Sequence, residues 1–178
     1  QPVSPAAADR CQHALWDELA RAAAEAADAP FLRMASGDLS FGAMERQASS
    51  LAAGLRCLGV AAGANVSLLL PNCAEFVVTW FALARLGAVT APVNTAMRGS
   101  LLRDALALVG SEVLVVHETL WPQFEAVRAE LPGLKTLIVV GQPPAGTQAW
   151  SALLAGGPDG APPADVHFSS LCLLLYTS

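Results

Sequence analysis

The sequence predicts an α/β fold in which helices cover a largely parallel β-sheet. Short apolar runs alternate with helical stretches through the middle of the chain, and each run is nearly continuous rather than alternating with polar residues. Such runs are typical of strands buried on both faces, as crossover helices bury them in parallel sheets. Apolar residues make up 54% of the 178 residues and charged residues 14%, which is enough apolar material for one domain with a buried core.

Two helices and a small hairpin are expected before this repeat begins. Apolar residues at helical spacing predict the first helix over residues 13–27. The segments 31–34 and 39–41 are predicted to pair around a Ser36-Gly37-Asp38 turn. A second amphipathic helix is expected to end just before Gly59, the residue that follows its C-cap.

The centre of the chain follows a strand–helix repeat. We expect strands at residues 66–70, 89–93, 113–116 and 136–140, and helices at residues 75–86, 101–109 and 120–131. Gly87 and Gly110 come directly after two of these helices, where glycine is the preferred residue. Because parallel neighbours need crossover connections of this kind, the pattern predicts repeated βαβ units.

The end of the chain has a different composition. Residues 141–170 are rich in proline and glycine, which predicts a long loop with one helical turn near residues 150–154. A strand is expected over residues 171–176, followed by Thr177-Ser178. A natural domain rarely ends on a buried apolar strand, so we expect the front part of a longer protein. Residues 1–12 are expected to be disordered or loosely attached, and residues 13–178 to form an N-terminal α/β subdomain.

Composition argues against several functions. The net charge is −5, with 10 Lys+Arg, 15 Asp+Glu and no basic run, which argues against nucleic acid as a partner. No apolar run approaches the ~20 residues of a spanning helix, and no signal peptide is evident, so a cytoplasmic protein is expected. The four cysteines and three histidines are scattered, which predicts no metal site; the cysteines are expected to be small buried side chains.

Thr177 and Ser178 are the first candidates for chemistry. In open α/β sheets, ligands bind beyond the carboxyl ends of the strands, where hydroxyls and backbone N–H groups can hold a polyphosphate. Alone, two hydroxyls at the end of a strand are weak evidence for a site.

A series of stretches, in order, resembles the N-terminal region of the adenylate-forming superfamily. This family includes acyl-CoA synthetases, luciferases and the adenylation domains of peptide synthetases, which share an acetyl-CoA synthetase-like fold. The resemblance covers residues 12–178, and its parts match core motifs in sequence and spacing. They are Leu39-Ser40-Phe41 with Leu51 to Val60, Val66 to Asn72 with Glu75-Phe76, Ala84 to Asn94, and Leu175-Tyr176-Thr177-Ser178.

The resemblance implies a reaction of a carboxylic acid with ATP and Mg²⁺ that gives an acyl-adenylate and pyrophosphate. The acyl group then passes to a thiol, usually that of coenzyme A, as in fatty acid metabolism. Thr177 and Ser178 would begin the loop that holds the ATP phosphates. The family's remaining glycines, its magnesium ligand and its catalytic lysine have no counterpart here, so no catalytic residue is assigned and the fragment is expected to be inactive. The single lysine, Lys135, is expected to be a surface charge.

Three further residues are weaker candidates for contact with coenzyme A or the acyl group. Asn94 follows a strand, although a turn or cap role is the stronger expectation. Arg98 and Arg103 could approach phosphates, although a solvated helix face is favoured for both. The stretch from Asn94 to Gly99 leans toward carnitine-CoA ligase-like, medium-chain or aryl-acid members.

Several alternatives stay open. Within the family, the chain could come from a peptide synthetase or a fatty acyl-AMP ligase, and a homodimer is an option. A non-catalytic α/β interaction module is another class. A dinucleotide-binding oxidoreductase is disfavoured, because Pro71 to Glu75 stands where GxGxxG is required. The adenylation hypothesis requires Thr177 and Ser178 at a cleft on the strand tips; placement on a sheet edge or away from such a cleft counts against it.

Overall fold

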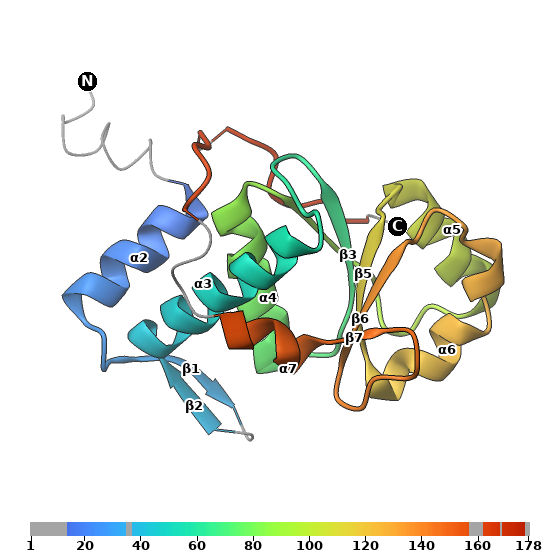
Figure 1. Ribbon diagram of the computed structural model, residues 1–178, viewed down its shortest axis with the longest axis horizontal. Coiled ribbons are helices and arrows are strands. Elements are labelled where there is room, and N and C mark those ends of the chain that lie inside the picture. Colours follow the sequence, from blue (N-terminus) through green and yellow to red (C-terminus); the bar gives the residue numbers. More distant parts are fainter. Residues whose placement is uncertain (1–13, 35–36, 157–161, 168, 177–178) are drawn as a thin grey trace.

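The computed structural model describes residues 14–34, 37–156, 162–167 and 169–176, which form helices around a parallel sheet (Figure 1). The sheet has the strand order β4-β3-β5-β6-β7, and all neighbouring pairs are parallel. The predicted α/β fold is therefore confirmed. The strands are β3 (Asn65–Leu69), β4 (Val89–Pro92), β5 (Val113–His117), β6 (Thr136–Val140) and β7 (Gln148–Ala149).

Helices cover both faces of this sheet (Figure 1). On β5, Val113 and Val115 join the core under α3 and α4, whereas Leu114 and Val116 join the core under α5 and α6. This alternation buries the strand on both sides, as its continuous apolar run predicted. The helices are α2 (Leu15–Glu25), α3 (Phe41–Cys57), α4 (Ala74–Leu86), α5 (Gly99–Val109), α6 (Trp121–Glu125) and α7 (Trp150–Leu153), with 3₁₀ turns η1 (Glu118–Leu120), η2 (Arg128–Glu130) and η3 (Leu154–Gly156).

The predicted hairpin is present, but its turn was misplaced. Strands β1 (Pro30–Met34) and β2 (Gly37–Ser40) pair antiparallel, and Gly37 and Asp38 both lie within β2. Ser36 lies outside the described residues. The second strand stops at Ser40 because the Ser40 hydroxyl accepts a hydrogen bond from the Ala43 N–H at 3.2 Å and so caps α3.

The prediction of one helix over residues 120–131 was wrong. The segment divides into η1, α6 and η2, with three-residue turns such as Glu130 N–H to Val127 O at 3.0 Å. Pro132 disfavours a helical conformation at Leu131, which explains why the last turn is tight and short. The short strand β7 was missed inside the predicted loop, whereas the helical turn near residue 150 is confirmed as α7.

The long connection after η3 lies against the end of α4. Gly87 caps α4 with a φ of +66°, and a Cβ there would lie 2.7 Å from Val166 Cγ1. Ala164 N–H donates to Arg85 O at 2.8 Å in the same place. Gly87 is therefore required both for the left-handed cap and for this close approach.

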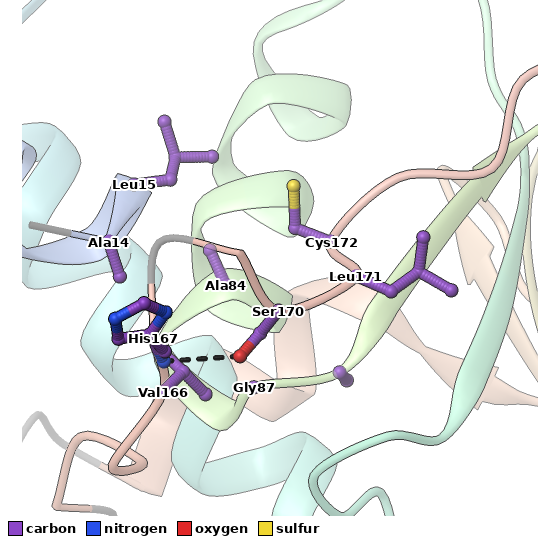
Figure 2. Close-up of a pocket in the computed structure, with 10 residues that line it drawn as sticks. Ala14, Leu15, Ala84, Gly87, Val166, His167, Ser170, Leu171 and Cys172 are labelled. Atoms are coloured by element: carbon purple, nitrogen blue, oxygen red, sulfur yellow. Dashed lines mark hydrogen bonds between the residues drawn. The ribbon is translucent and has the colours of Figure 1, made fainter. Parts of the chain in front are cut away.

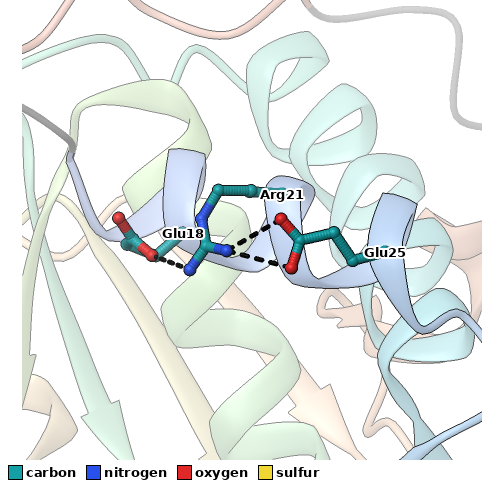
Figure 3. Close-up of polar contacts among 3 residues, drawn as sticks. All are labelled: Glu18, Arg21 and Glu25. Carbon is teal, nitrogen blue, oxygen red and sulfur yellow. Dashed lines mark hydrogen bonds and ion pairs between the residues drawn. The ribbon is translucent and has the colours of Figure 1, made fainter. Parts of the chain in front are cut away.

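Helix α2 packs on the α3–α4 layer through Trp16, whose ring lies 4.5 Å from the Arg85 guanidinium carbon. Its outer face has an exposed ion-pair group, in which Arg21 contacts Glu18 at 2.7 Å and Glu25 at 2.9 Å (Figure 3). Exposed pairs of this kind contribute little to stability, so this face is a solvated surface. In the described part of the chain, no helix combines the length and hydropathy that crossing a membrane requires.

The expectation of buried cysteines was wrong for two of the four. Cys57 ends α3 and is exposed, and Cys172 is exposed on the last described segment. Cys73 is half-buried at the N-cap of α4, where burial raises the pKa of its thiol to about 11. Cys11 lies outside the described residues.

Candidate functional site

A cleft of about 460 Å³ opens at the carboxyl ends of β3 and β4. Leu70 to Asn72 follow β3, and Pro92 to Thr95 form the end of β4 and the loop after it. Phe76 from α4 and Leu175-Tyr176 from the end of the described chain complete the wall. The cleft therefore lies beyond the carboxyl ends of two neighbouring parallel strands. Ligands of open α/β sheets bind at such positions.

The loop between β4 and α5 forms one rim of this cleft and is held by its own side chains. Asn94 Oδ1 accepts a hydrogen bond from Ala96 N–H at 2.9 Å, the contact of an Asx turn. Gln123 Nε2, from α6, donates to Thr95 O at 3.3 Å. The exposed Asn94 therefore has the turn role that the sequence favoured, and it lines the cleft at the same time.

The two candidate arginines have partners within the protein. Arg98 Nη1 donates to Thr95 O at 2.6 Å and to Met97 O at 2.8 Å, which ties the exposed side chain to the rim loop. Arg103 bonds Asp104 at 2.7 Å and Glu130 at 2.8 Å, and the hydrogen bond from Arg103 lowers the pKa of Asp104. Neither arginine is among the residues that line the cleft. Their contact with coenzyme A stays a prediction.

The strand expected over residues 171–176 is reduced to a single bridge between Leu173 and Thr90 on β4. Thr90 N–H donates to Cys172 O at 3.0 Å, and Leu174 N–H donates to Thr90 O at 2.9 Å. The segment runs parallel to β4 along its outer edge, and Leu171 and Leu175 are 58% and 67% exposed. The prediction of a buried strand was wrong: among the described residues this segment pairs with β4 alone, and Leu171 and Leu175 are exposed.

Tyr176 is the residue of this segment that is anchored to the core. Its side chain packs against the apolar cluster under α5, and its hydroxyl donates to Ala105 O within that helix. Burial raises the pKa of the phenol. This contact was not predicted from the sequence, in which Tyr176 is only part of a motif. The available signal was the position of the chain's single tyrosine at the end of an apolar run.

Thr177 and Ser178 lie outside the described residues. The adenylation hypothesis depends on the placement of these two residues, so it is not tested by their position. The segment before them follows the outer edge of β4, and Leu175 and Tyr176 line the cleft at the strand tips. Their contact with phosphate stays a prediction.

A smaller cavity of about 220 Å³ lies at the opposite end of the same segment, between α2, the end of α4 and residues 166–172 (Figure 2). Most of its wall is apolar. His167 N–H donates to Ser170 Oγ at 3.1 Å, and His167 Nδ1 lies 2.8 Å from Ser169 Oγ, so these polar groups bond one another. We assign the candidate site to the larger cleft, because only that cleft combines the carboxyl ends of the strands with exposed polar side chains.

Metal ligands do not gather in the part of the chain that the structure describes: no three His, Cys, Asp or Glu side chains there could hold one ion. The described residues therefore do not fit a magnesium site. Binding of Mg²⁺ stays a prediction.

Comparison with known proteins matches residues 19–178 to the family described as AMP-binding enzyme. An indoleacetate–CoA ligase from Aromatoleum aromaticum is 34% identical over 148 residues, which are 83% of this chain and 29% of that protein. A salicyl-AMP ligase / salicyl-S-ArCP synthetase from Mycobacterium tuberculosis is 33% identical over 86% of this chain and 27% of its own length. The crystal structure of an anthranilate CoA ligase in complex with anthranoyl-AMP aligns with a TM-score of 0.89 and 27% identity, over 94% of this chain and 33% of that one.

A parallel sheet covered by helices, with a cleft at the carboxyl ends of its strands, is typical of α/β domains that bind ligands. The matched residues place it further: the chain belongs to the AMP-binding enzyme family, and the resemblance seen in the sequence is confirmed. The chain spans about a third or less of the length of the relatives described above.

Proposed function

We propose that this chain is the N-terminal subdomain, residues 13–178, of an ATP-dependent acid–thiol ligase. The full-length protein would join a carboxylic acid to AMP with release of pyrophosphate, and then transfer the acyl group to coenzyme A. The observation that supports this most is the cleft at the tips of β3 and β4, whose wall includes the last residues before Thr177-Ser178.

The chemistry suits a site of this kind. A carboxylate is a poor electrophile, whereas its mixed anhydride with AMP has a good leaving group. In-line attack on the α-phosphorus mainly requires positioned reactants and neutralised charge. In this proposal Thr177 and Ser178 hold phosphate oxygens, and the rim loop fixed by Asn94 and Arg98 limits the cleft on the other side. Groups for magnesium and proton transfer would come from the rest of the protein.

One relative supports a different thiol as the acceptor of the acyl group. The Mycobacterium tuberculosis relative is named a salicyl-AMP ligase that loads ArCP, and it matches 86% of this chain. A carrier-protein thiol in place of coenzyme A is therefore the alternative for the second half-reaction. Both alternatives share the adenylation step.

An aromatic or arylacetic acid is the first substrate class to test. Relatives with about a third identity are named for indoleacetate, 4-coumarate and salicylate, and the aligned crystal structure contains anthranoyl-AMP. A long-chain fatty acid ligase is also 34% identical, over 55% of this chain, so the panel must include fatty acids.

The test is pyrophosphate release by the full-length protein with MgATP and a panel of aryl, arylacetic and fatty acids. We expect release with at least one acid, trapping of the acyl-adenylate by hydroxylamine, and thioester formation when coenzyme A is added. The Lys135→Gln variant is a control far from the cleft, since Lys135 pairs with Glu112 at 2.5 Å near the amino ends of the strands, and it should keep full activity. The 178-residue chain alone should be inactive. Absence of pyrophosphate release with every acid would overturn the proposal.

A further inference from the structure

The segment that leads into the cleft is held by few contacts before Tyr176. Beside β4, it is held by the two hydrogen bonds at Thr90. Leu174 N–H forms the last backbone bond that the described residues show for this segment, and Leu175 is 67% exposed. Backbone hydrogen bonds therefore do not hold Leu175 and Tyr176, the two residues before Thr177, in place.

The tyrosine side chain supplies the missing anchor. Its ring packs with the apolar side chains between α5 and the sheet, and its hydroxyl bonds Ala105 O in the interior of α5. Ala105 is 7% exposed, so this carbonyl is shielded from water. A helix-interior carbonyl is fixed by its own helix and has a second lone pair available for such a bond.

The same contact connects Tyr176 to the helix that follows the rim loop. Helix α5 begins at Gly99, directly after the rim loop at residues 94–98, and Tyr176 lines the same cleft. A bond from Tyr176 to α5 therefore fixes the distance between the rim loop and the point where the chain enters the cleft.

We propose that Tyr176 is a positioning residue for ATP: its side chain, fixed on α5, holds the end of residues 171–176 at the cleft, from which the chain continues to Thr177 and Ser178. This inference rests on the proposed function. Tyr176 itself does not need to touch the nucleotide, and its effect reaches the phosphates through the residues after it.

The test compares the full-length protein with its Tyr176→Phe variant, which keeps the ring and removes the hydroxyl. A buried neutral hydrogen bond corresponds to a factor of about 3 to 10 in an equilibrium constant. We expect the KM for ATP to rise by about that factor, while the KM for the acid at saturating ATP stays unchanged. Tyr176→Leu, which also removes the aromatic ring, should raise the KM for ATP further.

A matched control separates positioning from general stability. Ser111→Ala removes a buried hydrogen bond of 2.7 Å between Ser111 and Ser67, near the start of β5 and away from the cleft. It should lower the melting temperature without changing the KM for ATP. An unchanged KM for ATP in Tyr176→Phe, with normal pyrophosphate release, overturns the positioning role and leaves the proposed function intact.

If no acid in the panel reacts, the positioning role is tested by measuring the equilibrium binding of MgATP to the full-length protein and to its Tyr176→Phe variant. Weaker binding by Tyr176→Phe than by the unchanged protein supports the positioning role without turnover. If the unchanged full-length protein binds no MgATP, both the proposed function and the positioning role are contradicted.

Discussion

The two sides of β4 differ in how they are paired. On its inner side, β4 pairs with β3 through four consecutive residues, from Asn65 with Val89 to Leu68 with Pro92. On its outer side, the segment 171–176 makes one bridge at Thr90 and leaves two leucines exposed. The sheet is thus fixed by its own core, whereas the segment that reaches the cleft is held by two backbone hydrogen bonds at Thr90 and by the side chain of Tyr176.

The largest effect is expected in the core of the sheet. Leu114 on β5 is fully buried, so Leu114→Ala should lower the free energy of unfolding by about 3 kcal/mol through lost burial and the cavity left behind. Leu175→Ala, at an exposed position of the outer segment, should change it by less than about 0.5 kcal/mol. Urea denaturation measures both. Equal losses would show that the outer segment is as much a part of the core as β5.

A glycine pair tests the contact between α4 and the connection before the outer segment. Gly87→Ala should cost about 2–3 kcal/mol, because the new Cβ meets both a left-handed φ and Val166. Gly110→Ala has a similar φ of +64° but open space around the Cβ, so it should cost only about 1–2 kcal/mol.

Limited proteolysis adds a local measure to this pair. Gly87→Ala should speed cleavage within residues 162–176, and Gly110→Ala should not. Identical behaviour of the two variants would contradict the close packing of Val166 on α4.

A smaller effect is expected where α7 joins the scaffold. Trp150 Nε1 donates to Thr79 Oγ1 at 2.9 Å, and both side chains are buried. Trp150→Phe should destabilise the protein by about 1 kcal/mol from this bond, in addition to any loss of packing. A double-mutant cycle with Thr79→Val isolates the bond, and a coupling energy near zero would contradict it.

The smallest effect concerns reactivity rather than stability. Since the pKa of Cys73 is about 11, only about 1% of its thiol is ionised at pH 9, against about half for a thiol of pKa 9. The thiolate is the reactive form, so iodoacetamide should label Cys73 much more slowly than a free cysteine peptide. Exposed Cys172 should be labelled before Cys73. Mass spectrometry of the labelled peptides measures both rates, and faster labelling of Cys73 would contradict its burial.

The contrast between the two sides of β4 also explains which features the sequence could predict. Val66 to Leu70 and Val113 to Val116 are continuous apolar runs followed by turn or helix signals, so local pattern and tertiary burial agree, and both strands were predicted within a residue. The run from Leu171 to Tyr176 has the same composition, yet it has a single neighbour here. Whether a segment forms a strand depends on the neighbouring strands that pair with it, and the residue pattern of the segment alone does not identify those neighbours.

The candidate site was predicted in part for the same reason. Asn94 was recognised as a turn residue from its place after a strand, and the turn is present. The bond from Tyr176 to Ala105 joins residues 71 positions apart, which no local pattern reports. The partners of Arg103 were also missed, since Glu130 lies on a separate turn that the sequence had assigned to one long helix.

Hydrogen–deuterium exchange of the full-length protein with and without MgATP would locate the nucleotide on the sheet. We expect slower exchange in peptides that cover the rim loop, residues 94–98, and the outer segment, residues 171–176. Protection confined to the amino ends of the strands, near Gly63 and Gly110, with none at the cleft, would contradict this expectation.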